Sequence, residues 1–307
     1  MKIAIVGSGA LGGFFGATFA DNGHNVVLVD IDTEKLKAIE ESGLTIISKE
    51  DEKTIHLQTS SKTDNVGPVD LVFFSVKSNA TLNAAKSLSP LIGKETLIMS
   101  IQNGIDNVEK IVSVVGSDKV IGGITAHSFQ MLSPTHIRYV GGTGHLHIGK
   151  IDNNNTSQVY KIADILKKSG ISVEISKSIQ DYIWYKLLIN TPINAIAAIT
   201  RLNNGELLQS KEACKLMKIT AEEALAVAKA EKIQILMTKH PVEFSFAALK
   251  AANENKASML QDIEAKRPTE IDAINGAIVK RGKKLGIPTP INTTLTTLVK
   301  IEEFKYL

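Results

Sequence analysis

The sequence predicts an α/β fold in two parts, and two observations support this. In the first half of the 307-residue chain, short apolar runs alternate with helical patterns, which is typical of a doubly wound parallel sheet covered by helices on both faces. After about Lys177 the strand signals nearly stop and the pattern is helical. We therefore expect a Rossmann-like domain over residues 1–177 and an all-helical domain over residues 178–307.

Each strand of the first part is predicted from a continuous hydrophobic run, because a strand that is covered on both faces has no polar side. The runs expected to form strands are KIAIV (2–6), NVVLVD (25–30), DLVFFSV (70–76), TLIMSI (96–101), KVIGGITA (119–126), HIRYV (136–140), HLHIG (145–149) and ISVEIS (171–176). The stretches expected to form helices between them are 10–21, 33–41, 78–88 and 104–114. From Ile179 onward we expect helices, including 210–231 and 269–285.

The composition is that of an ordinary soluble globular protein, with 43% hydrophobic and 22% charged residues. The formal net charge is +3 and the acids and bases are well mixed, which argues against nucleic acid or a membrane as a partner. The single cysteine, Cys214, allows no intramolecular disulfide and fits a reducing compartment. The N-terminal run reaches glycines too early for a signal peptide or a membrane span, so we expect a cytoplasmic protein.

A glycine-rich motif lies between the first strand and the first helix, which is the context that a dinucleotide-binding loop requires. Its residues are Gly7, Ser8, Gly9, Ala10, Leu11 and Gly12. Gly7 permits a tight turn, Gly9 lets the backbone approach a pyrophosphate, and Gly12 lets the helix pack closely on the strand. The helix N-terminus adds free amides and partial positive charge. The alternative is a purely structural glycine turn.

The second strand ends in Asp30, eighteen residues after Gly12. An acid at this distance is placed to accept hydrogen bonds from the adenosine ribose hydroxyls and to repel a 2′-phosphate. The motif therefore favours NAD(H) over NADP(H). Lys35 and Lys37, one turn further on, could instead pair with a phosphate, and Asp30 could simply start a turn.

Two further strand ends carry polar residues, and ligands of open α/β sheets bind beyond the carboxyl ends of strands. Lys77 follows DLVFFSV, and Asn103-Gly104 follows TLIMSIQ. Both positions are placed to touch a cofactor. Asn-Gly is also common turn chemistry, so the alternative for Asn103 is a turn.

The stretch WYKLLINTPINAIAAIT (184–200) is apolar except at intervals of four. Lys186, Asn190 and Asn194 then share one side of a helix, within roughly 80° of one another. Such a stripe suits an anionic, oxygen-rich substrate. The alternative is that Lys186 extends to solvent from a domain edge while the asparagines cap neighbouring elements. Pro192 removes one helical hydrogen bond, so a kink is expected nearby.

Other polar positions have structural explanations. Glu270 would lie in the first turn of a helix that starts at Thr269, where the helix dipole favours an acid. The basic run Lys280-Arg281-Lys283-Lys284 would decorate a solvated helix end. His145 and His147 share one face of a strand, a spacing compatible with a metal. No cysteine or acid supports them, so we expect no metal site.

Together these motifs resemble the ketopantoate reductase (2-dehydropantoate 2-reductase) family and the wider group of NAD(P)-dependent 2-hydroxyacid dehydrogenases. The resemblance runs essentially from end to end, and its motifs occur in the order of the family. The motifs are GSGALG (7–12), VK (76–77), NG (103–104), WYKLLIN (184–190), NGEL (204–207), SMLQDI (258–263) and TEIDAINGAI (269–278).

The resemblance assigns a role to each matching position. Lys186 falls on the catalytic lysine that protonates the keto oxygen, and Glu270 falls on the glutamate that completes the active site. The positions implied for substrate binding are Asn190, Asn194, Asn204, Asn255 and Ser258. The positions implied for the cofactor, besides the glycine-rich loop, are Asn103, Lys77 and, near the nicotinamide, Ser128. Many family members hold the 2′-phosphate of NADPH with a basic residue where this chain has Asp30-Ile31-Asp32, so NADH is favoured here.

The resemblance implies an oxidoreductase that reduces 2-dehydropantoate (ketopantoate) to pantoate by hydride transfer from NAD(P)H, in pantothenate and coenzyme A biosynthesis. It also implies a small-molecule 2-oxo acid as the partner, and a monomer or homodimer. One alternative is an NADH-dependent 2-hydroxyacid dehydrogenase for other branched or aromatic 2-oxo acids. Another is a nucleotide-binding sensor without catalysis, against which the presence of both Lys186 and Glu270 argues.

Overall fold

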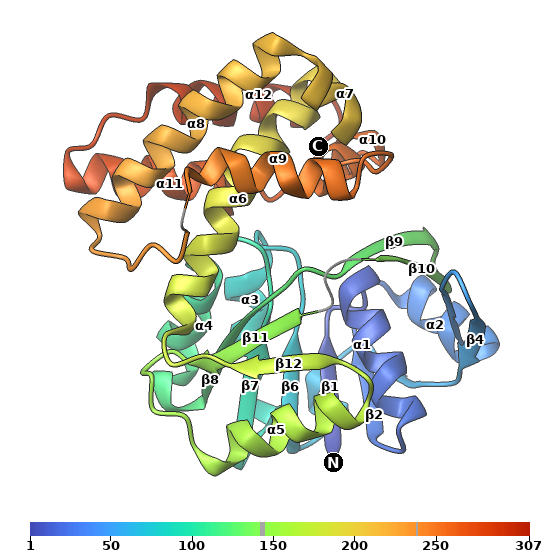
Figure 1. Cartoon of the computed structure of the whole chain (residues 1–307). Helices are drawn as coiled ribbons and strands as arrows, with labels where there is room; N and C mark the ends of the chain where they lie inside the picture. The colour runs from blue at the N-terminus through green and yellow to red at the C-terminus, as the bar shows by residue number, and fades with distance from the viewer. Residues whose placement is uncertain (142–144, 238) are drawn as a thin grey trace. The chain divides into compact units, whose positions relative to one another are not determined.

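The computed structural model describes residues 1–141, 145–237 and 239–307, which divide into two compact units (Figure 1). The first unit comprises Met1–Gln102 and Asn107–Ile179, and the second comprises Asn103–Asp106 and Gln180–Leu307. The second unit is therefore discontinuous in sequence. It takes a short stretch from the first half of the chain, for which the hydrophobic pattern gives no sign.

The first unit is built on an eight-stranded sheet with the order β12-β11-β8-β7-β6-β1-β2-β5. Its strands are β1 (Lys2–Val6), β2 (Asn25–Val29), β5 (Gln58–Ser60), β6 (Val69–Phe74), β7 (Ile92–Ser100), β8 (Val120–Thr125), β11 (His145–Lys150) and β12 (Ser172–Ile175). The six strands from β5 to β8 are parallel, whereas β11 is antiparallel to β8. The predicted α/β class with a mainly parallel sheet is confirmed.

The helices of this unit follow from the strand order. The chain runs outward from β1 in both directions, and right-handed crossovers then place helices on opposite faces of the sheet. These helices are α1 (Ala10–Asp21), α2 (Thr33–Ser42), α3 (Thr81–Lys86), α4 (Asp106–Val115) and α5 (Ser157–Lys168), with 3-10 turns at Thr63–Asn65, Ser89–Leu91 and Ser117–Lys119. The first residue of α4, Asp106, belongs to the second unit.

A second, four-stranded sheet has the order β4-β3-β10-β9. Its strands are β3 (Leu44–Ile47), β4 (Glu52–Ile55), β9 (Ser128–Ser133) and β10 (His136–Gly141). Of these strands, the sequence predicted β10 alone. The burial pattern explains why β4 and β9 were missed, since β4 is mostly exposed and β9 alternates exposed with half-buried residues, so neither forms a continuous apolar run. It does not explain β3, which is buried or half-buried throughout.

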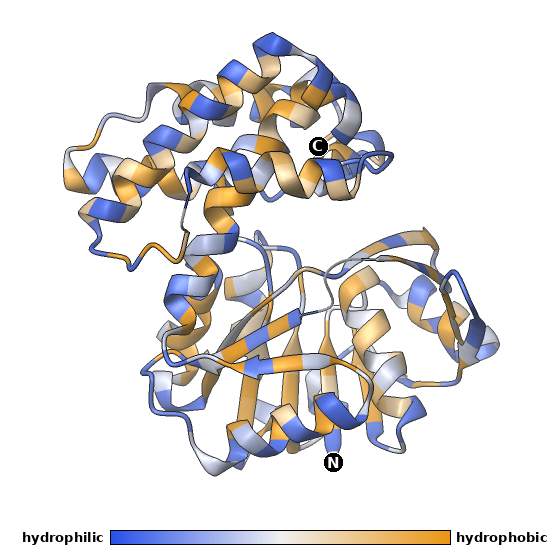
Figure 2. Ribbon diagram, in the orientation of Figure 1, coloured by the Kyte–Doolittle hydropathy of each residue, from blue (hydrophilic) through white to orange (hydrophobic). Residues whose placement is uncertain are grey.

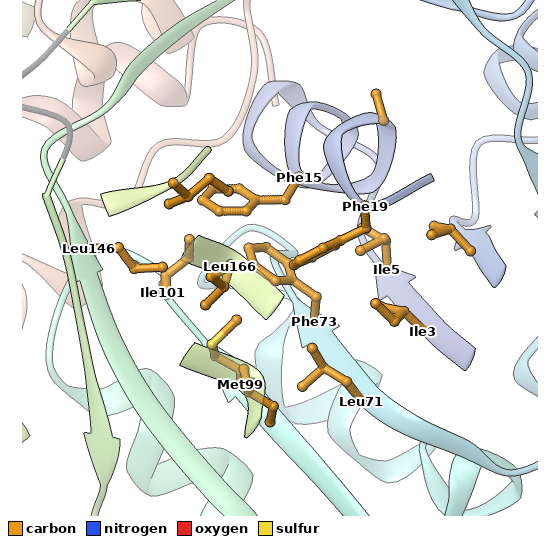
Figure 3. Close-up of a cluster of buried hydrophobic side chains, with 14 of the residues drawn as sticks. Ile3, Ile5, Phe15, Phe19, Leu71, Phe73, Met99, Ile101, Leu146 and Leu166 are labelled. Carbon is orange, nitrogen blue, oxygen red and sulfur yellow. The ribbon is translucent and has the colours of Figure 1, made fainter. Parts of the chain in front are cut away.

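The core of the first unit lies between the large sheet and the helices α1 and α5 (Figure 3). Phe15 and Phe19 of α1 reach down onto Phe73 of β6, and the Phe15 and Phe73 rings stack at 4.7 Å between centroids. Leu166 of α5 belongs to the same buried cluster. The side chains are large and fully enclosed, so this layer fixes the sheet whose strand ends carry the predicted cofactor residues.

The second unit is helical. Its elements are α6 (Ile179–Thr200), α7 (Asn204–Gln209), α8 (Lys211–Ala230), α9 (Pro241–Ala251), α10 (Ser258–Glu264), a 3-10 turn η4 (Ile271–Ala273), α11 (Asn275–Leu285) and α12 (Pro290–Glu303). Figure 2 shows orange and blue alternating along α8, as expected for an amphipathic helix. No helix among the described residues is both long and apolar enough to cross a membrane.

Two expectations for the chain after residue 268 are wrong. A single helix over 269–285 does not form, because η4 and α11 are separate and Ile274 between them has ψ −93°. Glu270 is therefore outside the first turn of α11, and the helix dipole does not account for it. In the basic run, Arg281 is not on a solvated surface, since its side chain is only 14% exposed and is paired with two carboxylates.

Candidate functional site

The glycine-rich loop has the geometry that its sequence predicts. Gly7 has φ +98°, a conformation that L side chains rarely adopt, and a Cβ there would lie 2.7 Å from the Val76 amide nitrogen. A Cβ on Gly12 would overlap the carbonyl oxygen of Gly7. Both positions therefore require glycine, one for the turn and one for the close approach of α1 to the loop.

The start of α1 is open where a phosphate would bind. Gly9 is exposed, and a Cβ there would meet nothing within 4 Å. By helix geometry, the amides of Ala10, Leu11 and Gly12 have no carbonyl of their own helix to bond. The first turn carries no acidic residue. These features fit the pyrophosphate of a dinucleotide, because the amides and the helix dipole favour an anion at this point.

Asp30 lies just beyond β2 and binds back onto this loop. Its Oδ2 accepts hydrogen bonds from the backbone amide and the hydroxyl of Ser8, both at 2.7 Å. The same oxygen forms an ion pair with Lys35 Nζ at 3.0 Å. Burial alone would raise the pKa of Asp30, but the Ser8 hydrogen bonds and the Lys35 charge outweigh burial and lower it. The carboxylate is therefore ionised and braces the loop, and Lys35 partly neutralises it.

The other predicted cofactor residues lie at strand ends. Lys77 is exposed beyond β6, the strand that pairs with β1 in parallel, so it leaves the sheet at the same edge as Gly7. Ser128 is exposed at the start of β9. Asn103 belongs to the second unit, although its segment follows β7 directly.

The two predicted catalytic residues both belong to the second unit and interact electrostatically. Burial lowers the pKa of Lys186 in α6 to about 8, while the negative charge of Glu270 acts in the opposite direction. Glu270 is 9% exposed, and its Oε2 accepts a hydrogen bond from Asn103 Nδ2 at 3.2 Å. Lys186 keeps part of its surface exposed. Burial thus lowers the pKa of Lys186, and the carboxylate whose charge opposes that shift is held by Asn103.

Asn194, one of the predicted substrate residues, is buried and uses its polar atoms inside the protein. Its Oδ1 accepts from the hydroxyl of Ser258 at 3.1 Å and from the Met259 amide at 3.4 Å, and its Nδ2 donates to the Asn190 carbonyl at 3.3 Å. Asn194 thus caps the N-terminus of α10 from another helix. Ser258 is exposed and Asn190 half-buried, so these two can reach a ligand.

Asn204 has a similar supporting position at the start of α7. Its Nδ2 donates to the Ala252 carbonyl at 2.8 Å, and its amide donates to the Asn255 carbonyl at 3.0 Å. Asn204 is 7% exposed, whereas Asn255 is half-buried. Asn204 therefore fixes the turn that presents Asn255.

Two residues that the sequence reasoning missed support α6 around Pro192. Ser245 Oγ donates to the Ile189 carbonyl at 3.0 Å, and Asn275 Nδ2 donates to the Thr191 carbonyl at 3.0 Å. Both donors bind carbonyls near the position where the proline removes a helical hydrogen bond. For Asn275 the sequence contained a usable signal. A side-chain amide within an apolar stretch is expected to be buried, and a buried amide needs a hydrogen-bond partner.

The histidine pair that could suggest a metal has other partners. His145 Nδ1 lies 3.1 Å from the Ser172 hydroxyl, and His147 Nδ1 lies 3.6 Å from Glu174 Oε2. Within residues 1–141, 145–237 and 239–307, no group of three or more His, Cys, Asp or Glu side chains is placed to hold a metal ion.

Two family models match this chain and together span most of it. Residues 3–153 match the model described as ketopantoate reductase PanE/ApbA, and residues 178–303 match the model of the C-terminal part of the same proteins. The 2-dehydropantoate 2-reductase of Pyrococcus abyssi is 32% identical over 303 residues, covering 99% of this chain and 98% of that protein. The enzyme of the same name from Archaeoglobus fulgidus is 31% identical, covering 97% of each.

Solved structures agree with these matches. A PanE/ApbA family ketopantoate reductase from Ralstonia eutropha JMP134 is 33% identical, with a TM-score of 0.90 over 100% of this chain and 99% of that one. D-mandelate dehydrogenase in a ternary structure with NADH and anilino(oxo)acetate is 29% identical, with a TM-score of 0.93 over the same shares of the two chains.

Proposed function

The chain belongs to the ketopantoate reductase family of oxidoreductases, and from this premise we propose that it reduces 2-dehydropantoate to pantoate with NAD(P)H, a step of pantothenate and coenzyme A biosynthesis. The observation that carries the proposal is the electrostatic interaction of Lys186 with Glu270, whose carboxylate accepts a hydrogen bond from Asn103. The proposal assigns the cofactor to the domain 1–177 and the catalytic pair to the domain 178–307.

Lys186 acts as the general acid in this proposal. A bound nicotinamide would supply the hydride to the keto carbon, and negative charge would develop on the keto oxygen. The Lys186 ammonium stabilises that charge and donates its proton to the oxygen. Its pKa of about 8 makes it a better acid near neutral pH than an ordinary lysine. Glu270 keeps the lysine protonated and oriented.

The five residues predicted to bind substrate fall into two groups that differ in burial. Asn190, Asn255 and Ser258 are half-buried or exposed, and they contact the substrate carboxylate and hydroxyl in this proposal. Asn194 and Asn204 are buried and hold Ser258 and Asn255 in place. The side-chain amides can donate to the substrate carboxylate, and the Ser258 oxygen, whose proton is donated to Asn194, can accept from the substrate hydroxyl.

The cofactor is proposed to be NADH in preference to NADPH. The carboxylate of Asp30 beyond β2 would disfavour a 2′-phosphate, and its contact with Ser8 places it beside the loop that would hold the pyrophosphate. The Lys35 ion pair reduces the charge of Asp30, so we expect the preference to be moderate. Lys77, Asn103 and Ser128 are assigned to the remainder of the cofactor.

The test is a reductase assay of the purified protein with 2-dehydropantoate, 2-oxoisocaproate and phenylglyoxylate, each with NADH and with NADPH. The highest kcat/KM is expected for 2-dehydropantoate. A clear preference for phenylglyoxylate would instead favour the alternative, a 2-hydroxyacid dehydrogenase for aromatic substrates. The similarity to D-mandelate dehydrogenase supports this alternative. If no 2-oxo acid were reduced with either cofactor, the enzymatic proposal would fail.

A further inference from the structure

Arg281 of α11 contacts three other segments of the helical unit. Its Nη1 donates to both carboxylate oxygens of Glu231, at 2.9 and 2.8 Å, and its Nη2 donates to Asp106 Oδ1 at 3.1 Å. The guanidinium also lies over the indole ring of Trp184, 5.9 Å from its centroid. The side chain is 14% exposed, so these are contacts of a largely buried cation.

The segment Asn103–Asp106 is fixed to the same region at three points. Asn103 donates to Glu270 at 3.2 Å, and Asp106, 7% exposed, is held by Arg281. Between them Gly104 has φ +92° and lies so close to Ala273 that a Cβ would overlap the carbonyl oxygen of Ala273. We therefore expect a displacement of Asp106 to move Asn103, because the segment is short and in tight contact with η4.

The third contact of Arg281 bears on the helix that carries Lys186. Trp184 lies two positions before Lys186 in α6 and is 1% exposed. One guanidinium thus touches the helix of the proposed acid and, through Asp106, the segment whose asparagine anchors the proposed carboxylate.

We propose that Arg281 is a positioning residue for the proton-donating pair, setting the place of Lys186 through Trp184 and the place of Glu270 through Asp106 and Asn103. The inference rests on the function proposed for Lys186 and Glu270. Arginine suits this task because its planar fork can hold two carboxylates in fixed directions, whereas a lysine offers a single point charge.

The neighbouring Lys280 provides a matched control. Its Nζ also pairs with Asp106, at 3.2 Å, but its side chain is 74% exposed. An exposed ion pair is screened by water, so it contributes little to the position of either side chain. If the total charge around Asp106 mattered, the two residues would be equivalent. If buried geometry mattered, Arg281 alone would affect catalysis.

The experiment compares Arg281→Met, Arg281→Lys and Lys280→Met with the unaltered protein. Arg281→Met is expected to lower kcat about 10- to 100-fold, as misplaced catalytic groups do, with little change in the KM of the 2-oxo acid or in cofactor affinity. Arg281→Lys should recover part of the loss, and Lys280→Met should leave kcat unchanged. Equal effects of Arg281→Met and Lys280→Met would overturn the inference.

Asp106→Asn provides a test that depends less on folding, because Arg281 keeps its contacts with Glu231 and Trp184. It should lower kcat in the same direction as Arg281→Met. Trp184 is the only tryptophan in the sequence, so its emission reports on the guanidinium contact independently of activity. It should change in Arg281→Met and stay near that of the unaltered protein in Asp106→Asn.

The outcomes separate this inference from the function on which it rests. If Lys186→Met is inactive while Arg281→Met and Asp106→Asn keep full kcat, the positioning role is refuted and the proposed function stands. If Arg281→Met only lowers Tm and the folded protein has normal kcat, Arg281 is purely structural and the inference is refuted. If Lys186→Met remains active, the acid role of Lys186 and the inference both fail, whereas the proposed function fails only if the unaltered protein reduces no 2-oxo acid.

Discussion

The side-chain amide of Asn103 donates to Glu270 Oε2 at 3.2 Å, although the two residues are 167 positions apart in the sequence. The resemblance to the family implies a cofactor role for the first and a catalytic role for the second. Their contact links the two roles, because an amide that orients Glu270 also influences the charge beside Lys186.

Lys186→Met should lower kcat by about 10²- to 10⁴-fold, the usual contribution of a general acid, with a much smaller effect on KM. The helix should stay intact, because methionine has a similar length and suits an apolar helix. Steady-state kinetics with circular dichroism would test this. Near-native kcat combined with a lower Tm would show that the lysine has only a structural role.

The rate of reduction should fall as the pH rises through about 8, because the proton donor is lost as Lys186 deprotonates. Glu270 raises the pKa of this lysine, so Glu270→Gln should move the descending limb to lower pH and slow catalysis less severely than Lys186→Met. Profiles of kcat against pH would measure both shifts. An unchanged limb in Glu270→Gln would contradict the pairing.

Lys186 should also reduce stability at neutral pH. Its folded-state pKa lies below the unfolded value, so the unfolded chain binds the additional proton and stability rises with pH from about 8 to about 10.5. Lys186→Met should therefore be the more stable protein at neutral pH, and the difference should shrink at higher pH. Urea denaturation at two pH values would measure this, and a difference independent of pH would argue against a buried charge.

Asn194→Ala should raise the KM of the 2-oxo acid and leave cofactor affinity nearly unchanged, because Asn194 holds the exposed Ser258. It should also destabilise the protein by about 1 kcal/mol, the usual cost of losing a helix cap. Substrate and cofactor titrations together with denaturation would test both effects. Loss of cofactor binding alone would contradict the assignment.

Asp30→Ala should weaken NADH binding more than NADPH binding, and Lys35→Met should strengthen the discrimination against NADPH, because it leaves the Asp30 charge uncompensated. Fluorescence titration of each cofactor gives the dissociation constants independently of turnover. A native preference for NADPH in kcat/KM would refute the assignment of Asp30.

The sequence predicted most of the large sheet, because its buried parallel strands form continuous apolar runs. β1 has the predicted limits, and β2, β6, β7 and β8 lie within four residues of theirs. β4 was missed because a mostly exposed strand has no such run, and it is defined only by pairing with β3. Local pattern carries no information on pairing between distant segments.

The candidate site was predicted residue by residue from motifs, but its internal contacts were not. The spacing of Lys186, Asn190 and Asn194 predicted one helix face. The hydrogen bonds that this helix receives from α9, α10 and α11 come from residues too distant in sequence for that spacing to reveal. The basic run at the end of α11 was predicted to be solvent-exposed. Arg281 instead donates hydrogen bonds to two carboxylates that lie 50 and 175 positions away in the sequence. The interruption between η4 and α11 at Ile274 lies next to the contact of Ala273 with Gly104. That contact joins distant segments, so no local sequence pattern reveals it.

The discontinuous second unit has a consequence for how the chain reaches its native state. Asn103–Asp106 leaves the ribosome early, yet its partner Arg281 follows 175 positions later. Closing so long a loop is slow and entropically costly, so this segment acquires its native environment late. A polypeptide truncated near residue 177 would expose Ile105, 5% exposed in the complete chain, and leave the Asp106 carboxylate without its guanidinium. Expression of either half alone should yield a less soluble or less cooperative product than the intact polypeptide.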